Sequence, residues 1–151
     1  MKNITALLHF CIFLFLNLSC NKDSNPEITI DHQKLYDCYE SQHFDSTTLS
    51  SQLIGIWKWS AQSCAWNGKT VGADKSVKVN FDANGTFSVL ENLKVVTKGA
   101  WKLRIVNGEI LGLDIDQSST YLYGRSLLCN NELLFNNSIV DGCDNLFIRQ
   151  D

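Results

Sequence analysis

The length and composition of the chain indicate one folded domain. Its 151 residues are 44% hydrophobic, which gives enough apolar surface for a core. The formal net charge of -3 and the scattered positions of the thirteen Lys and Arg residues exclude a nucleic-acid binder, because such proteins carry a basic stripe.

Residues 1–20 have the pattern of a secretory signal. A lysine is followed by an apolar run from Ala6 to Leu16, which is shorter than the ~20 residues that a membrane-spanning helix requires. The ending "LNLSC" resembles the lipobox of bacterial lipoproteins, those of Bacteroidetes in particular, with Ser19 at the small position and Cys20 as the acylated residue. This resemblance implies an exported protein that a lipid on Cys20 anchors to the outer membrane, at its periplasmic face or at the cell surface. The alternatives are ordinary secretion with a free or paired Cys20 thiol, and a buried hydrophobic helix.

Residues 21–50 are predicted to form a tether and N-terminal segment, and 51–151 the folded barrel. The stretch after the signal is polar and carries Pro26, the only proline of the chain, which is typical of a flexible linker. His32 and His43 lie in this segment near two aspartates, but solvated polar residues explain them better than a metal site does. We expect no metal and no cofactor.

From 53 onward the chain shows the alternation of β-strands and no helical period of ten or more residues. Turn residues separate the apolar runs at short intervals, which favours hairpins over crossovers. The eight predicted strands are 53–63, 75–81, 85–91, 94–105, 109–116, 120–129, 132–139 and 145–150. They predict an all-β fold, an eight-stranded antiparallel up-and-down β-barrel in which the first strand lies beside the last. The alternative is a two-sheet sandwich, but its Greek-key crossings need longer connections.

The first strand carries a recognisable motif. Trp57 and Trp59 share one face, because side chains alternate along a strand, and the lysine between them belongs in water, so the tryptophans face the interior. Gly55 and Trp57 in "GIW", with Arg149 in the last strand, resemble the G-x-W motif of the lipocalins and the arginine that packs near its tryptophan. The resemblance implies a lipocalin-like barrel that binds a small apolar ligand, inside the barrel or at its mouth.

Four cysteines remain once the signal and the acylated residue are set aside, and in an exported chain they favour two disulfides. The barrel topology chooses among the possible pairings. Strand one ends at Cys64 and Cys143 opens strand eight, so these two meet at one rim. Cys129 lies at the opposite rim, where the segment with Cys38 joins strand one. The predicted bridges are Cys64 to Cys143 and Cys38 to Cys129, and the second holds 31–50 over the barrel mouth.

Strand parity also selects candidate ligand-binding residues on the inner face of the barrel. They are Trp59, Phe87, Glu91, Trp101, Tyr123 and Phe135. A plain core position is the alternative for each aromatic residue, and solvation at the rim is the alternative for Glu91. The strand at 120–129 is ambiguous, because either its two tyrosines with Arg125 or Leu122 with Leu128 can face inward.

The chain shows no catalytic constellation. It contains no G-x-S-x-G, H-E-x-x-H or Gly-rich phosphate motif, so we expect no enzyme. The function that the lipocalin resemblance implies is binding of a small apolar ligand by a lipid-anchored envelope protein. The alternative is an envelope protein–protein interaction module, an inhibitor or accessory subunit with a packed barrel, whose loop at 65–75 presents Trp66 to a partner that the sequence does not identify.

Overall fold

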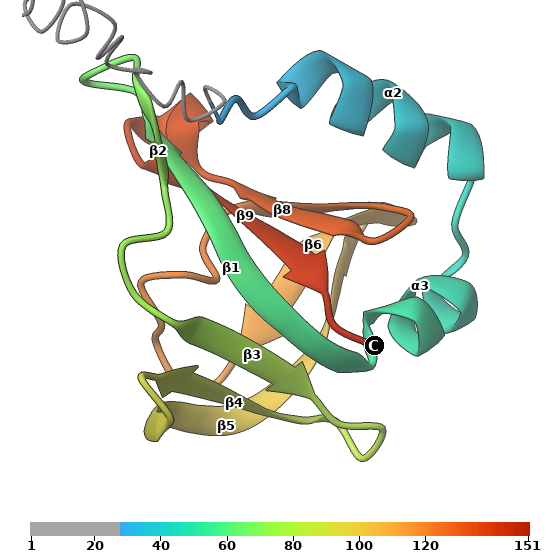
Figure 1. Ribbon diagram of the computed structural model, residues 1–151. Coiled ribbons are helices and arrows are strands. Elements are labelled where there is room, and N and C mark those ends of the chain that lie inside the picture. Colours follow the sequence, from blue (N-terminus) through green and yellow to red (C-terminus); the bar gives the residue numbers. More distant parts are fainter. Residues whose placement is uncertain (1–27) are drawn as a thin grey trace, which may run out of the picture.

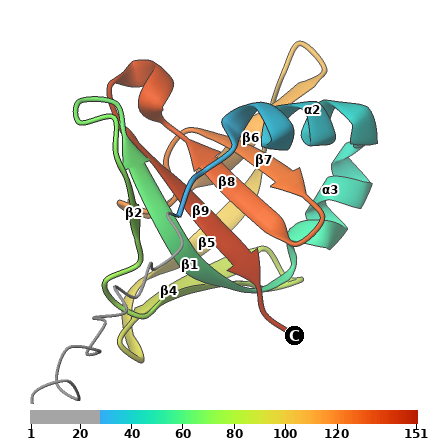
Figure 2. The ribbon, with the colours of Figure 1, turned by 45° about the horizontal axis from the view of Figure 1, so that its top comes forward.

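A single antiparallel sheet curls into an open half-barrel with two helices packed outside it (Figure 1, Figure 2). The computed structural model describes residues 28–151, so the predicted signal, the lipidation site Cys20 and most of the polar stretch after it lie outside the described residues. Within 28–151, no helix is long and apolar enough to cross a membrane. The expectation of a mostly antiparallel β fold is confirmed.

The two helices, α2 (His32–Gln42) and α3 (Ser46–Leu53), precede the strands. The strands are β1 (Gly55–Cys64), β2 (Thr70–Gly72), β3 (Val77–Phe81), β4 (Thr86–Glu91), β5 (Lys94–Val106), β6 (Glu109–Ile115), β7 (Arg125–Cys129), β8 (Glu132–Asn136) and β9 (Cys143–Arg149), with a 3₁₀ turn, η2 (Ser138–Val140), before β9.

The order of strands across the sheet is β6-β5-β4-β3-β1-β9-β8-β7, and β2 pairs with β1 off this path. The pairing of β1 with β9 confirms that the first predicted strand lies beside the last. In the described part of the chain, β6 and β7 are the two ends of this order and no ladder joins them. The sheet is therefore open at this edge.

Several predicted boundaries are wrong. The strand expected at 120–129 begins only at Arg125, because Gly124 adopts a φ of 94° and a side chain on it would overlap the carbonyl of Asn136. The strand expected at 132–139 ends at Asn136 and gives way to η2. Leu53 ends a helix instead of starting a strand, and β2 was not predicted.

The segment expected at 31–50 as part of a loose N-terminal region is mostly helical. Asp31 caps α2 by accepting the amide of Lys34 at 3.0 Å, and Asp45 caps α3 by accepting the amide of Thr48 at 2.7 Å. Each helix buries only two residues, so the apolar period was too sparse to predict them. The aspartates that the sequence suggested were solvated are therefore helix caps.

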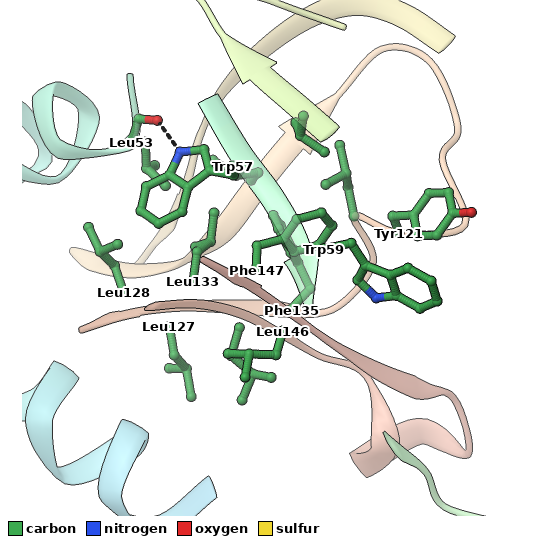
Figure 3. Packing of buried hydrophobic residues seen from close by; sticks show 14 of the residues in the cluster. Leu53, Trp57, Trp59, Tyr121, Leu127, Leu128, Leu133, Phe135, Leu146 and Phe147 are labelled. Atoms are coloured by element: carbon green, nitrogen blue, oxygen red, sulfur yellow. Dashed lines mark hydrogen bonds between the residues drawn. The ribbon is translucent and has the colours of Figure 1, made fainter. Parts of the chain in front are cut away.

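The sheet is buried on both faces where α2 covers it. Leu127 and Leu146 lie on the opposite side of β7 and β9 from Trp57 and Phe147, and they face α2 (Figure 3). All four of these side chains are buried. This second apolar layer explains why "SLLC" and "ELLF" are continuous apolar runs and not alternating ones.

Both predicted disulfides are present. Cys64 and Cys143 are directly opposite each other in the β1–β9 ladder, and their bridge joins the first long strand to the last. The bridge from Cys38 to Cys129 fixes the middle of α2 to the end of β7. The second bridge thus holds the helix against the outer face of the sheet and not over the mouth of the barrel.

Gly55, Trp57 and Arg149 form one contact group. The fully buried indole of Trp57 donates to the carbonyl of Leu53 at 2.8 Å, and the guanidinium of Arg149 lies 4.4 Å from its ring centroid. Arg149 also donates to the carbonyl of Ile54 at 3.0 Å. Gly55 has a φ of 131°, a backbone conformation that residues with a side chain rarely adopt, and a Cβ there would lie 2.9 Å from the same guanidinium.

Candidate functional site

Two of the six candidate ligand residues belong to the packed interior. Phe87 and Phe135 are both fully buried. The ring of Phe87 lies 6.4 Å from that of Phe81, and the ring of Phe135 packs edge-on against Phe147 at 5.9 Å. These aromatic contacts fill the middle of the half-barrel.

Two further candidates, Trp59 and Glu91, belong to a cluster at one rim. The hydroxyl of Tyr121 donates to the carboxylate of Glu91 at 2.6 Å, and the ammonium of Lys75 lies 3.1 Å from the same carboxylate. Trp59 packs edge-on against the ring of Tyr121 at 5.5 Å. The hydrogen bonds from Tyr121 and then Lys75 lower the pKa of Glu91, while burial raises the pKa of Tyr121. Glu91 is therefore an anion with partners from its own chain.

A buried asparagine completes this rim. Asn145 accepts a hydrogen bond from the indole of Trp59 at 3.2 Å and another from Gln62 at 3.1 Å. Its own amide donates to the carbonyl of Thr120 at 3.5 Å. Asn145 therefore ties the loop before β7 to β1 and β9, a role that strand alternation did not predict.

Arg125 faces outward, toward α2. Its guanidinium lies 2.9 Å from the carboxylate of Glu40 and over the rings of Tyr36 and Tyr39, at 5.3 and 5.6 Å from their centroids. Leu128 takes the inward position on β7. Of the two faces that the sequence left open for this strand, the leucine face is the interior one.

The open edge of the sheet is hollowed by a groove of about 550 Å³, which we name the open-edge groove. Its lining includes Leu113, Ile115, Tyr123, Asn136, Ile139 and Val140. Ile139 and Val140 are 74% and 69% exposed, more than the two other adjacent pairs of exposed branched residues in 28–151, Val95 with Val96 and Ile105 with Val106. Tyr123 is the candidate ligand residue that lies in this groove.

A neighbouring hollow of about 440 Å³ contains Trp101 and shares Asp114 and Ile115 with the open-edge groove. The ring of Trp101 packs edge-on against Phe81 at 5.5 Å. Its buried indole N–H has no hydrogen-bond partner among residues 28–151. The nitrogen is shielded from solvent, so a ligand in the hollow does not reach it unless the ring moves.

The structure therefore divides the predicted site residues among three places. Tyr123 and Trp101 line two neighbouring hollows at the open edge, Trp59 and Glu91 lie in the rim cluster, and the two phenylalanines are core. Sequence reasoning missed Ile139 and Val140, because 132–139 was assigned to a strand. Their position directly before the turn sequence "DGCD" was the signal that could have placed them in an exposed turn.

Residues 28–151 contain no group of three side chains that could hold a metal ion. His32 instead contacts the buried carboxylate of Asp144 at 2.7 Å. That carboxylate also accepts the backbone amides of Asn137 and Ser138, each at 2.6 Å. This aspartate joins the start of α2 to η2 and β9, and its role is structural.

Comparison with known proteins finds no match for the chain among protein-family models, curated proteins or solved structures. The function is therefore argued from the geometry of the described residues.

Proposed function

We propose that the protein binds a small, largely apolar ligand in the open-edge groove. The observation that carries the proposal is the pairing of a groove of about 550 Å³ with exposed Ile139 and Val140 in its lining. A hollow of this size can hold a small molecule. Exposed apolar surface on a folded protein often marks a site that a bound ligand covers.

The polar groups of the groove would orient such a ligand. They are Arg104, Asp114, Arg125, Asn136 and Asn137. A mostly apolar wall with a few fixed polar groups is the usual composition of a ligand site.

We further propose that the half-barrel is a lipocalin-like domain on an envelope lipoprotein. The contact group of Gly55, Trp57 and Arg149 supports the family assignment. The two disulfides support export, because such bridges persist in oxidising compartments. Metabolic labelling with an alkyne fatty acid tests the anchor: label on the wild type that disappears in Cys20→Ala is expected, and label that survives this substitution contradicts it.

Ligand binding is tested with N-phenyl-1-naphthylamine, a neutral probe that fluoresces in apolar surroundings. Wild-type protein should bind the probe, and Val140→Asp should weaken binding by about tenfold or more, because the charge lies in the apolar lining. Leu93→Asp is the matched control, since Leu93 is 82% exposed in the β4–β5 turn, outside the groove. No binding, or equal weakening by both variants, would overturn the proposal.

The alternative function is that of a protein-interaction module. It is favoured by Trp66, which is 69% exposed in the turn after β1. The amide of Ala65 donates to the carbonyl of Gly142, so this turn is tied to the segment that follows Ile139 and Val140. Site-specific crosslinking from position 66 in the native envelope tests it. A discrete crosslinked adduct that disappears in Val140→Asp would favour the interaction module. If Trp66→Ala binds the apolar probe as the wild type does, the residue that contacts the partner is not part of the ligand site.

A further inference from the structure

The backbone of β6 presents hydrogen-bonding groups to the open-edge groove. In an antiparallel ladder, the backbone groups of successive residues point alternately to the two sides of the strand. The amide of Asp116 donates to the carbonyl of Ala100 at 3.2 Å, so the backbone of Asp116 faces β5. The backbone groups of Ile115 and of Leu113 therefore point the other way. Both residues line the open-edge groove.

No described strand pairs with these outward groups. Leu113 and Ile115 each present an amide N–H and a carbonyl, and the ladders of residues 28–151 leave this side of β6 without a neighbour. The turn and loop hydrogen bonds of the same residues do not engage them either. Two donors and two acceptors on alternate residues of a strand edge are a template for another strand.

We propose that the open-edge groove binds an extended peptide segment, which pairs with Leu113 and Ile115 as an added strand. The inference rests on the proposed function, because it names the class of ligand for the same groove. Every ladder between described strands is antiparallel, so the same pairing is expected for the peptide. In this mode of binding the main-chain hydrogen bonds supply affinity, and side chains at alternate positions supply specificity.

The pairing determines which side chains of the peptide should be apolar. Residues directly opposite each other in an antiparallel pair place their side chains on the same face of the sheet. Leu113 is buried, and Ile115 packs against the core cluster. Peptide residues that bond to these two therefore turn their side chains toward the core, where apolar groups are favoured. The residues between them share the face of the exposed Asp114, where polar side chains fit.

A single strand fits this edge better than a second copy of the chain does. Ile139 and Val140 of η2, with Tyr123, line the same groove as the edge of β6. Two β6 strands could pair only if these walls of both copies shared the space beside the strands. A peptide brings one strand without such walls. An extended segment is therefore the occupant that the groove admits.

Isothermal titration calorimetry of the full-length chain with acetyl-Thr-Val-Thr-Val-Thr-amide tests the inference. The unmodified peptide should bind. N-methylation of both valines removes the two N–H groups that face β6, and should weaken binding by about tenfold or more. N-methylation of the second and third threonines is the matched control, because these N–H groups face away from β6, and it should weaken binding by less than about threefold.

Variants at position 115 locate the peptide on the protein. Ile115→Pro removes the outward N–H, a change that an edge strand tolerates because this group lies outside the ladder with β5. It should weaken peptide binding by about tenfold, whereas the control Ile115→Val keeps the N–H and should bind within about twofold of the wild type. Should Ile115→Pro lose its thermal unfolding transition, the methylated peptides decide the question.

Four results would overturn the inference. They are no binding of the unmodified peptide, equal effects of the two methylation patterns, weakening by the threonine pattern alone, and equal affinities of folded Ile115→Pro and Ile115→Val. A dimer of the chain alone that Ile115→Pro abolishes, seen by analytical ultracentrifugation, would assign the edge to a second copy and also overturn it. Binding of N-phenyl-1-naphthylamine without binding of the peptide would exclude the added strand and keep the apolar site, whereas loss of both would exclude both.

Discussion

Replacement of Trp57 by alanine should lower the free energy of unfolding more than a change of the same size at the surface does. The indole is fully buried, and its removal leaves a cavity under Arg149. Loss of a buried aromatic side chain costs about 3–5 kcal/mol. Trp57→Phe keeps a ring beneath the guanidinium and loses the hydrogen bond to Leu53, so its cost should be about 1–2 kcal/mol.

Urea unfolding followed by far-ultraviolet circular dichroism measures these differences without relying on tryptophan fluorescence. Trp66→Ala is the control, because this side chain is exposed and should change the unfolding free energy by less than about 0.5 kcal/mol. A double-mutant cycle of Trp57→Ala with Arg149→Gln measures the contact between the two groups, which should couple by about 1 kcal/mol. A cost for Trp57→Ala no larger than that of Trp66→Ala would refute the core role of this residue.

Three further predictions concern buried polar and covalent contacts. Asp144→Asn should lower the unfolding free energy by about 2–3 kcal/mol in urea titrations, because the buried carboxylate accepts two backbone amides; an unchanged midpoint would contradict this. The hydrogen bond from Tyr121 lowers the folded-state pKa of Glu91, so Glu91 stabilises the fold above its unfolded pKa and loses that effect as the pH falls through its folded pKa. Tyr121→Phe should therefore raise the Glu91 pKa in a carboxyl NMR titration, and an unmoved pKa would exclude the bond. Replacing Cys38 and Cys129 by serine should cost about 4 kcal/mol and speed hydrogen exchange in α2 more than in β1; equal acceleration in both elements would show that the bridge does not fix the helix.

Strand alternation predicts the sheet well where one face is buried. β3 follows the pattern closely, with Val77, Val79 and Phe81 buried between less buried residues, and its register with β4 keeps like faces together. The same rule fails in β7, where Leu127 and Leu128 are adjacent and both buried. Alternating burial is expected where only one face of a sheet packs against the core. The pattern therefore does not predict that a helix covers the second face.

The helices could not be predicted from apolar period alone. α2 has only Leu35 and Tyr39 buried. Its other contacts include a disulfide, the ion pair of Glu40 with Arg125, and the contact of His32 with Asp144. The capping aspartate at position 31 was visible in the sequence, but a capping residue without an apolar stripe is weak evidence for a helix. The cysteine pairing was predictable because it depends on strand order, which hairpin turns fix.

The sequence predicts which face of a strand a candidate ligand residue lies on, but not whether that residue lines a ligand site. Strand parity predicts that Phe87 and Phe135 face the interior, and the structure confirms it. Whether an inward residue lines a cavity depends on how the neighbouring rings fill the space, which parity does not show. Tyr123 was selected by extending strand parity through a region that is a loop, so its place in a groove did not follow from that reasoning.

The position of α2 offers a physical reason why the sheet stays open between β6 and β7. The outer face of β7 carries Leu127 under the helix, the bridge from Cys129 to Cys38, and Arg125 paired with Glu40. These contacts fix β7 to the helix. Gly112 of β6 already lies against the backbone at Gly124, and the shift of β7 that a full ladder requires would strain the bridge and the ion pair. Closing the barrel would gain a few backbone hydrogen bonds, each with a net value of about 0.5–1.5 kcal/mol, at the cost of that packing. The arrangement that stabilises the helix therefore also keeps the open-edge groove accessible.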